Sequence, residues 1–281
     1  MKRYFILILP ILLYFNIVYA NNINVTTDSI QNNKNIPLQQ AFQDGERLSY
    51  DIKYGIISAG EAVLNANILD AKKDNDSLIV DPFALHKRWH ITSIARTNSF
   101  FDNIFKVRDK IESVSILDSM FSLRFEKNMR EGKYRQHRIH QNYPDLNMSI
   151  YTRYSRSQKK YINQRMDIPD KTFDLLSAFY KVRTMDLTPG KTYKINITAD
   201  GKNYVALVIV HRIETIETIF GDKTECLVLE PALQGESLFK QTGEIFIWLT
   251  NDNNKIPVLL QSKVIFGNFK AILNKAENIN K

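Results

Sequence analysis

Apolar and polar residues alternate along the stretch GERLSYDIKYGIISAGEA, residues 45–62. In its first half, single charged or hydroxyl residues separate the leucine, tyrosine and isoleucine positions, and this period of two sends side chains to opposite faces of a β-strand. A second alternating run follows. The pattern predicts two strands, residues 47–57 and 60–69, with Gly55 and Gly60 flanking the bend, because a missing Cβ permits positive φ or a bulge.

Strand-like runs of ordinary length continue along most of the chain, separated by turn residues. Several alternate clearly, whereas the more charged ones alternate imperfectly. The further predicted strands are RWHITSIART (88–97), FKVRDKIESVSI (105–116), FSLRFEKN (121–128), YRQHRIHQ (134–141), NMSIYTRYS (147–155), TECLVLEP (224–231), GEIFIWLT (243–250), KIPVLLQSKVIF (255–266) and GNFKAIL (267–273).

One segment has the spacing of a helix. Over residues 170–185, apolar side chains recur three and four positions apart, and Asp170 or Thr172 is available to cap the start. A hairpin is predicted directly after it, over residues 191–210, with an Asp-Gly turn at residues 200–201.

Roughly a dozen strands and one substantial helix near 171–185 predict a mainly β, α+β fold. Because no strand-helix alternation suggests a parallel sheet, we expect an antiparallel curved sheet or an open β-barrel with the helix across its face or mouth. We expect a single domain over residues 41–275 and a short tail at 276–281. Closure into a barrel and division into two subdomains both remain open.

The N-terminal segment reads as a secretory signal peptide over residues 1–20. Lys2 and Arg3 precede a short apolar run that ends in Val-Tyr-Ala, a small-x-small cleavage signature. An uncleaved anchor is the alternative, although the run is shorter than a spanning helix needs. Residues 21–40 are rich in Asn, Gln and Thr and predict a flexible leader. We therefore expect a periplasmic protein, or alternatively an extracellular one, without a later transmembrane segment.

The net charge limits which binding partners are expected, and the cysteine count limits which disulfides can form. Loss of Lys2 and Arg3 on cleavage lowers the formal charge from +8 to +6, and the remaining basic residues form no dense block. No nucleic-acid partner is expected. Cys226 is the single cysteine, so it can form no internal disulfide, and its apolar neighbours predict a small buried hydrophobic residue.

The chain lacks the sequence motifs of nucleophilic, nucleotide-dependent or zinc-protease chemistry. His86 and His90 lie four residues apart in a segment that looks extended, and His137 and His140 are expected on opposite faces of a strand. We expect no metal, no cofactor and no enzymatic activity. A pair of carboxylates placed by the fold stays open, because sequence does not show spatial separation.

Two charged groupings stand out, ARTNSFFDNIFKVRDKIES and FEKNMREGKY. Arg96 and Asp109 lie in strand-like runs joined by an aromatic connection, so a contact between the two side chains is possible if the runs pair. The alternatives are an ion pair that fixes register, a solvated face, and a polar anchor for a ligand headgroup.

An ordered series of fragments resembles a known family of exported bacterial proteins, the domain of unknown function 3108. The fragments are GERLSYDIKYGIISAGEA, ARTNSFFDNIFKVRDKIES, SLRFEKNMREGKY, DLLSAFYKVRTMDLTPG, DGK and GEIFIWLTNDNNKIPVLLQSKVIFG, and they cover residues 42–273. The resemblance implies a mostly β, envelope-facing protein and no particular activity. The organisation is also broadly similar to open β-barrel lipoprotein carriers of the LolA and LolB type, a likeness of architecture alone.

Three functions follow as hypotheses. The first is a non-enzymatic periplasmic protein that binds a lipid, glycolipid or lipidated protein in a curved β-sheet cavity. The second is an envelope scaffold that binds proteins through its surface or sheet edges, and the third is an envelope hydrolase. The candidate ligand-binding residues, each from a fragment that carries the resemblance, are Arg96, Asp109, Glu131, Tyr180 and Arg183.

Overall fold

The computed structural model describes residues 27–29, 41–70, 86–234, 244–264 and 267–280 of the chain. The predicted signal peptide lies outside these ranges. Within the segment predicted to be a flexible leader, Thr27–Ser29 form a short strand, β1, which pairs in parallel with β10. The other described strand pairs are antiparallel.

The described strands form a single curved sheet of 15 strands, in the order β1-β10-β11-β12-β13-β14-β15-β2-β3-β4-β5-β6-β7-β8-β9. Beyond β1, the strands are β2 (Glu46–Tyr54), β3 (Ile57–Leu69), β4 (Arg88–Thr97), β5 (Arg108–Ile116), β6 (Ser122–Glu131), β7 (Tyr134–Tyr143), β8 (Met148–Ser155), β9 (Lys160–Asp167), β10 (Thr192–Ala199), β11 (Lys202–Thr218), β12 (Gly221–Gln234), β13 (Glu244–Thr250), β14 (Pro257–Val264) and β15 (Gly267–Glu277).

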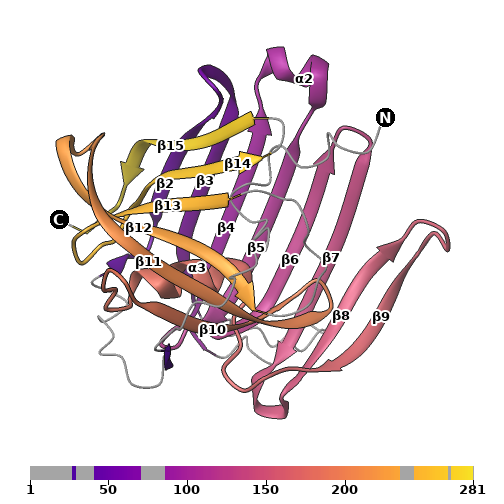
Figure 1. Cartoon of the computed structure of the whole chain (residues 1–281). Helices are drawn as coiled ribbons and strands as arrows, with labels where there is room; N and C mark the ends of the chain where they lie inside the picture. Colours follow the sequence, from indigo (N-terminus) through magenta and orange to yellow (C-terminus); the bar gives the residue numbers. More distant parts are fainter. Residues whose placement is uncertain (1–26, 30–40, 71–85, 235–243, 265–266, 281) are drawn as a thin grey trace.

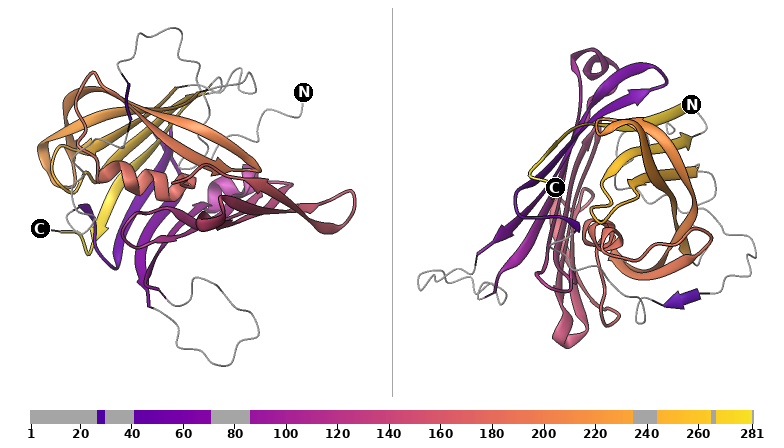
Figure 2. Two further views of the ribbon diagram at one scale, coloured as in Figure 1. Left: turned by 90° about the horizontal axis from the view of Figure 1, so that it is seen from below. Right: turned by 90° about the vertical axis from the view of Figure 1, so that its left-hand side faces the viewer.

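The sheet rolls up at one end and stays open at the other. Strands β10 to β15 curl around the helix α3 (Leu175–Arg183), whereas β5 to β9 extend away as a flatter wall (Figures 1 and 2). In the described part of the chain, the two outer strands of the order, β1 and β9, do not pair with each other. The predicted fold class is therefore confirmed in its open form: a curved antiparallel sheet that does not close into a barrel.

The predicted bend after the first strand is shifted. The strands β2 and β3 meet at Gly55 and Ile56, so Gly60 lies inside β3 and does not flank the turn. Gly60 is required there for a different reason, because a Cβ at this position would lie 2.2 Å from the carbonyl oxygen of Arg96. The glycine allows β3 and β4 to approach closely next to a register shift between β2 and β3.

The predicted helix begins later than its pattern suggested. Asp174, and neither Asp170 nor Thr172, is the N-cap of α3: its Oδ1 accepts hydrogen bonds from the backbone N–H groups of Leu176 and Ser177, at 2.9 Å each. The Asp174 backbone N–H in turn donates to the Ser177 hydroxyl oxygen at 2.9 Å, which completes a capping box. The preceding residues are extended, since Phe173 forms a bridge with Ile197 of β10.

Besides β1 and the 3-10 turn at Pro144–Leu146, two elements escaped the sequence pattern. The first is the short helix α2 (Ser99–Phe105) at the β4–β5 connection, capped by Asn98, and the second is the strand β9. Neither has a buried face: α2 contains no buried residue, and most positions of β9 are exposed. Hydrophobic periodicity detects an element only where one face is buried, so α2 and β9 gave no periodic signal.

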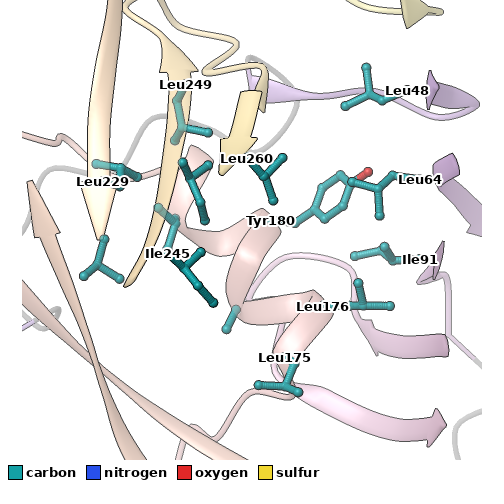
Figure 3. Close-up of a cluster of buried hydrophobic side chains, with 14 of the residues drawn as sticks. Leu48, Leu64, Ile91, Leu175, Leu176, Tyr180, Leu229, Ile245, Leu249 and Leu260 are labelled. Carbon is teal, nitrogen blue, oxygen red and sulfur yellow. The ribbon is translucent and has the colours of Figure 1, made fainter. Parts of the chain in front are cut away.

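The core lies between α3 and the two walls of the rolled sheet. Leu176 and Tyr180 point from α3 toward Ile91 and Leu64 on one wall, and leucine and isoleucine side chains of β12 and β13 face the other side of the helix (Figure 3). Cys226 of β12 belongs to this core, where burial raises the pKa of its thiol to about 11. The prediction of a buried cysteine is confirmed.

Candidate functional site

The structure separates the predicted pair Arg96 and Asp109. Strands β4 and β5 do pair, but their register places Ala95, and not Arg96, opposite Asp109. Neighbouring residues of a strand face opposite sides, so Arg96 lies on the outer face and Asp109 on the inner one. The predicted contact between them is wrong for this reason.

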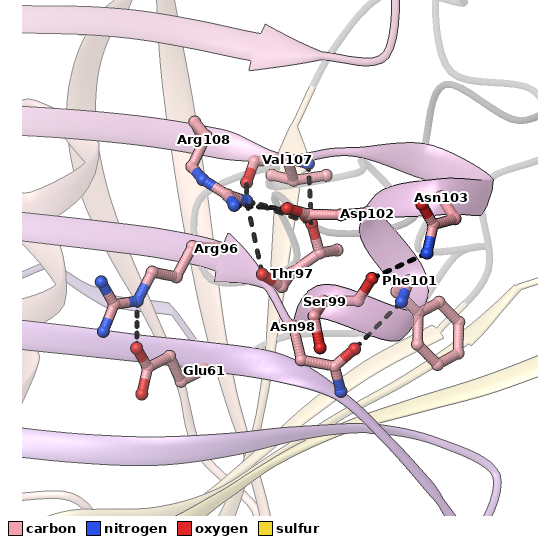
Figure 4. Close-up of polar contacts among 10 residues, drawn as sticks. All are labelled: Glu61, Arg96, Thr97, Asn98, Ser99, Phe101, Asp102, Asn103, Val107 and Arg108. Atoms are coloured by element: carbon pink, nitrogen blue, oxygen red, sulfur yellow. Dashed lines mark hydrogen bonds and ion pairs between the residues drawn. The ribbon is translucent and has the colours of Figure 1, made fainter.

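Arg96 forms an exposed ion pair with Glu61 on the neighbouring strand β3 (Figure 4). Beyond it, at the base of α2, Arg108 makes two parallel bonds to Asp102, with Nη1 3.0 Å from Oδ1 and Nη2 2.6 Å from Oδ2. These bonds hold the pKa of Asp102 below its ordinary value. The Arg108–Asp102 bonds fix the tip of the β4–β5 connection. Arg96 itself is exposed to solvent, away from the other four candidate residues.

The inner face brings together Asp109 and Glu131. Both residues are buried, at 4% and 1% exposure, and the backbone N–H of Arg130 donates to Asp109 Oδ1 at 2.8 Å. Burial and then the charge of Asp109 raise the pKa of Glu131 to about 8, and burial raises that of Asp109 as well. These shifts favour a single proton held by the pair at neutral pH, bound more strongly by Glu131.

A buried cation lies on the same face. Lys127 of β6 is buried, and its charge lowers the pKa values of both carboxyl groups of the acid pair. Its ammonium group contacts Asp200 at 2.9 and 3.1 Å, and Arg138 of β7 contacts the same carboxylate at 3.0 Å. Although burial opposes ionisation, these two cations hold the pKa of Asp200 below its ordinary value.

The Asp-Gly turn joins the two halves of the sheet. Asp200 and Gly201, with φ of 51° and 79°, form the predicted turn between β10 and β11. The Gly201 backbone N–H donates to Nε2 of His140 at 3.0 Å, and a Cβ on this glycine would lie 2.7 Å from the ring of Tyr151. The turn therefore places the Asp200 carboxylate against β6 and β7 and packs its own backbone onto β8.

The contact with Gly201 fixes the tautomer of His140. Its Nε2 accepts from Gly201, so Nδ1 carries the proton and donates to the Ser149 hydroxyl at 3.0 Å. Burial lowers the pKa of His140 to about 4. His137, three residues earlier, is on the opposite face and contacts Glu126 at 2.7 Å, which confirms the predicted division of the two histidines.

Tyr180 and Arg183 meet at the other end of the core, and there they surround Glu46. The Arg183 guanidinium makes two bonds to the Glu46 carboxylate, at 2.6 and 2.8 Å, and both side chains are fully buried. It also donates to the carbonyls of Ala41 and Asn254 at 2.8 and 3.1 Å. The guanidinium carbon lies 5.1 Å from the ring centre of Tyr180.

This second cluster is a junction between distant parts of the chain. Glu46 begins β2, Arg183 ends α3 and Asn254 follows β13. Burial, followed by the charge of Glu46, raises the pKa of the Tyr180 hydroxyl well above its ordinary value, so the tyrosine stays neutral. The five candidates therefore divide into an acid pair, a helix-anchoring ion pair with its tyrosine, and one surface arginine.

An apolar seam, defined here as the space between α3 and the inner faces of β10 to β13, lies beside this junction. It holds a cavity of about 30 Å³. The side chains that line the seam are all apolar: Ala178, Phe179, Val182, Ile195, Ile197, Ala206, Val208, Leu229, Pro231, Ile247 and Leu249.

Sequence reasoning missed Glu46, Lys127, His140 and Asp200 as members of these clusters. Each was visible only as a charged or polar residue in or next to a predicted strand or turn. An inward-facing charge at a position where the alternation calls for an apolar residue is the available signal, and Lys127 in FSLRFEKN shows it: it lies on the same face as the buried Leu123 and Phe125.

Within the described ranges, no three Asp, Glu, His or Cys side chains gather closely enough to hold a metal ion. No helix of the described part is long and apolar enough to cross a bilayer.

Known structures resemble the fold at low sequence identity. A β-barrel-like protein of the domain of unknown function DUF1849 from Brucella abortus superposes with a TM-score of 0.52 and 11% identity, covering 85% of this chain and all of its own. A protein from Bacteroides fragilis with a YmcC-like fold, proposed to be exported, gives a TM-score of 0.30 and 10% identity, covering 87% of this chain and 99% of its own. No curated protein sequence matches the chain significantly.

The family described as "Protein of unknown function (DUF3108)" matches residues 49–274, which include every described strand except β1 in whole or in large part. This match confirms the resemblance drawn from the ordered sequence fragments. The chain belongs to the DUF3108 family of proteins of unknown function.

Proposed function

We propose that this protein is an exported, periplasmic binding protein that holds the apolar part of a lipid, glycolipid or lipidated protein in the apolar seam. The observation that carries the proposal is the lining of the seam, in which every contributing side chain is apolar. A wholly apolar lining gives a hydrocarbon chain a favourable environment and offers water no hydrogen-bond partner.

The free space in the seam is small, so a ligand has to open it. About 30 Å³ is far below the roughly 300–1,000 Å³ of ordinary ligand pockets. The polar contacts of α3 favour opening on this side. Asp174 at its start accepts from Ser113 of β5 at 2.6 Å, and Arg183 at its end pairs with Glu46 of β2. The helix is thus bonded to one wall, while the side chains that it turns toward β10 to β13, Ala178, Phe179 and Val182, are apolar. In the described part of the chain, polar contacts to that side lie only at its two ends, as in the bridge of Phe173 with Ile197 and the bond from Arg183 to the Asn254 carbonyl.

Filling the seam tests the proposal. Val208 of β11 lines it, and Val208→Phe is expected to weaken binding of a dansyl-labelled fatty acid by about tenfold or more, because the larger ring occupies the ligand's space. Ile209→Phe, one residue along on the opposite face of β11, is the matched control and should leave binding unchanged. Equal affinities in the two variants, with both folded by circular dichroism, would contradict the proposal.

Native mass spectrometry of the protein purified from its own cell envelope without detergent tests both signal-peptide cleavage and the presence of a bound amphiphile. We expect a chain that begins at Asn21 and carries one bound amphiphile. A full-length chain would contradict export by a cleaved signal peptide. An empty chain that also fails to bind the labelled fatty acid would contradict the binding function.

An envelope scaffold is the second candidate, and the exposed edge of β9 favours it. Among the described strands, β9 pairs only with β8, so its other edge offers backbone hydrogen bonds to an added strand. A photoreactive residue at Gln164, exposed on β9, is expected to cross-link a protein partner in cells. The same residue at Ile56, 95% exposed in the β2–β3 turn, is the control. Lipid adducts alone, or equal protein adducts at both positions, would remove support for the scaffold.

The hydrolase hypothesis has one geometric candidate, the acid pair of Asp109 and Glu131. Both carboxyl groups are almost fully buried, and burial, followed by the charge of Asp109, raises the pKa of Glu131. The charge of Lys127 and the backbone N–H of Arg130, both from β6, act on the pair. This arrangement supports a structural role for the pair more strongly than a catalytic one, because a catalytic carboxyl group has to contact its substrate.

A further inference from the structure

A groove opens where β8 and β9 diverge from β7. The pairing of β7 with β8 begins at Arg138 and Arg153 and runs to Tyr143 and Met148, so residues 134–137 have no partner on β8 (Figure 1). The gap is a groove of about 200 Å³. We call it the arginine groove, because its lining includes Arg135, Arg138, Arg153 and Arg156, together with Tyr134 and Tyr154.

Positive charge in the arginine groove exceeds negative charge. None of its lining residues is an aspartate or a glutamate. Asp200 reaches in from the β10–β11 turn to contact Arg138 at 3.0 Å. Elsewhere in the described part of the chain, no carboxylate lies within ion-pair distance of Arg135, Arg153 or Arg156.

The register makes this excess unfavourable in the empty protein. Lys127 of β6 lies directly opposite Arg138 of β7, which lies directly opposite Arg153 of β8. Residues opposite each other share a face, and like charges in such positions destabilise a sheet. Asp200 contacts the first two cations and leaves the third uncompensated. A local arrangement that costs stability without a structural gain is typical of a binding site.

Most of the groove is already ordered for binding. In its favoured amide orientation, Gln136 accepts from Nη2 and Nε of Arg138 at 2.7 and 2.8 Å, so the guanidinium is fixed between Gln136 and Asp200. Arg156 donates to the carbonyl of Arg135 at 2.7 Å and stacks 5.8 Å from the ring centre of Tyr134. The side chain of Arg153 is exposed and makes no hydrogen bond or ion pair within the described residues, so its guanidinium is available.

We propose that the arginine groove binds a phosphate group, with Arg153 and Arg156 as its ligands and Arg138 as the fixed positive floor. A guanidinium binds phosphate through two parallel hydrogen bonds, and several uncompensated arginines suit a phosphate dianion better than a single carboxylate. A volume of about 200 Å³ accommodates a phosphate with a small organic substituent. Both a phospholipid headgroup and a free phosphate ester carry this chemistry. The site is independent of the apolar seam, since the two share no lining residue.

Calorimetric titration of the purified protein with glycerol 3-phosphate tests the site, and sedimentation with vesicles tests the lipid source. The vesicles contain phosphatidylcholine with or without phosphatidylglycerol. Arg153→Gln is expected to weaken binding to the preferred probe by about tenfold or more. Arg165→Gln removes the same charge from an exposed position of β9 outside the groove, and this control should change binding by less than about twofold.

Saturable binding of glycerol 3-phosphate that depends on Arg153 supports the site and identifies a soluble phosphate ester as sufficient. Arg153-dependent sedimentation with phosphatidylglycerol vesicles alone supports the site and identifies the lipid headgroup as the source. If Arg153→Gln and Arg165→Gln weaken binding equally, the loss reflects the lower net charge alone, and the proposal is overturned. Absence of binding to both probes would overturn it as well. All four outcomes are independent of whether a hydrocarbon chain enters the apolar seam.

Discussion

Replacing Arg183 by methionine is expected to lower the free energy of unfolding by about 3–5 kcal/mol. The variant leaves the Glu46 carboxylate buried without the two charge-assisted bonds that now compensate it, and it frees the carbonyls of Ala41 and Asn254. Removing one partner of a buried ion pair costs more than the pair itself contributes, because the remaining charge is desolvated and unpaired. Urea denaturation at neutral pH, followed by tryptophan fluorescence, measures the loss.

Two controls separate this effect from a simple loss of charge. Arg96→Met removes an arginine whose pair with Glu61 is exposed, and it should cost at most about 1 kcal/mol. The double variant Glu46→Leu/Arg183→Met removes both buried ions and should recover a large part of the loss. Similar stabilities for Arg183→Met and Arg96→Met would contradict the role of the buried pair.

Glu131→Gln is expected to stabilise the protein increasingly as the pH rises. The folded pKa of Glu131, about 8, lies above its ordinary value of 4.5. Between these values the folded chain keeps a proton that the unfolded chain has lost, so unfolding releases a proton and a higher pH favours it. The stability that this group contributes is complete at low pH and is lost as the pH rises toward 8. Glutamine stays neutral throughout and can still donate to Asp109.

The measurement is the difference in unfolding free energy between Glu131→Gln and the parent protein at pH 5 and at pH 8. We expect this difference to grow by roughly 3–5 kcal/mol in favour of the variant. Glu61→Gln, which removes an exposed carboxylate, should shift stability by the same small amount at both pH values. A constant difference for Glu131→Gln would show that the acid pair does not hold a shared proton.

The parts of the fold that depend on local periodicity could be predicted from the sequence. RWHITSIART marks β4 at both ends, and the Asp-Gly turn between β10 and β11 lies where its residues require it. Elements without a buried face, α2 and β9, left no periodic signal. The N-terminus of α3 was placed too early, because Asp170 and Thr172 are as acceptable in sequence as Asp174, and only the buried partner Ser113 distinguishes them.

The grouping of the candidate residues could not be predicted, because it depends on register and on contacts far apart in sequence. The register of β4 with β5 places Arg96 and Asp109 on opposite faces, and the pairing of β5 with β6 brings Asp109 to Glu131. Arg183 meets Glu46 across 137 positions of the chain. The alternation shows that a strand has two faces, but it does not show which residues of different strands share one.

The pairing of β15 with β2 has a consequence for the order in which the chain can fold. From β2 to β9 and from β10 to β15, each strand pairs with its sequence neighbours, so these contacts have short loops to close. The pairing of β2 with β15 instead joins residues such as Asp51 and Asn274, which are 223 positions apart. During synthesis, the edge of β2 that pairs with β15 remains unpaired until almost the whole chain has been made. Any factor that prevents premature aggregation of the nascent chain is therefore expected to act on that edge.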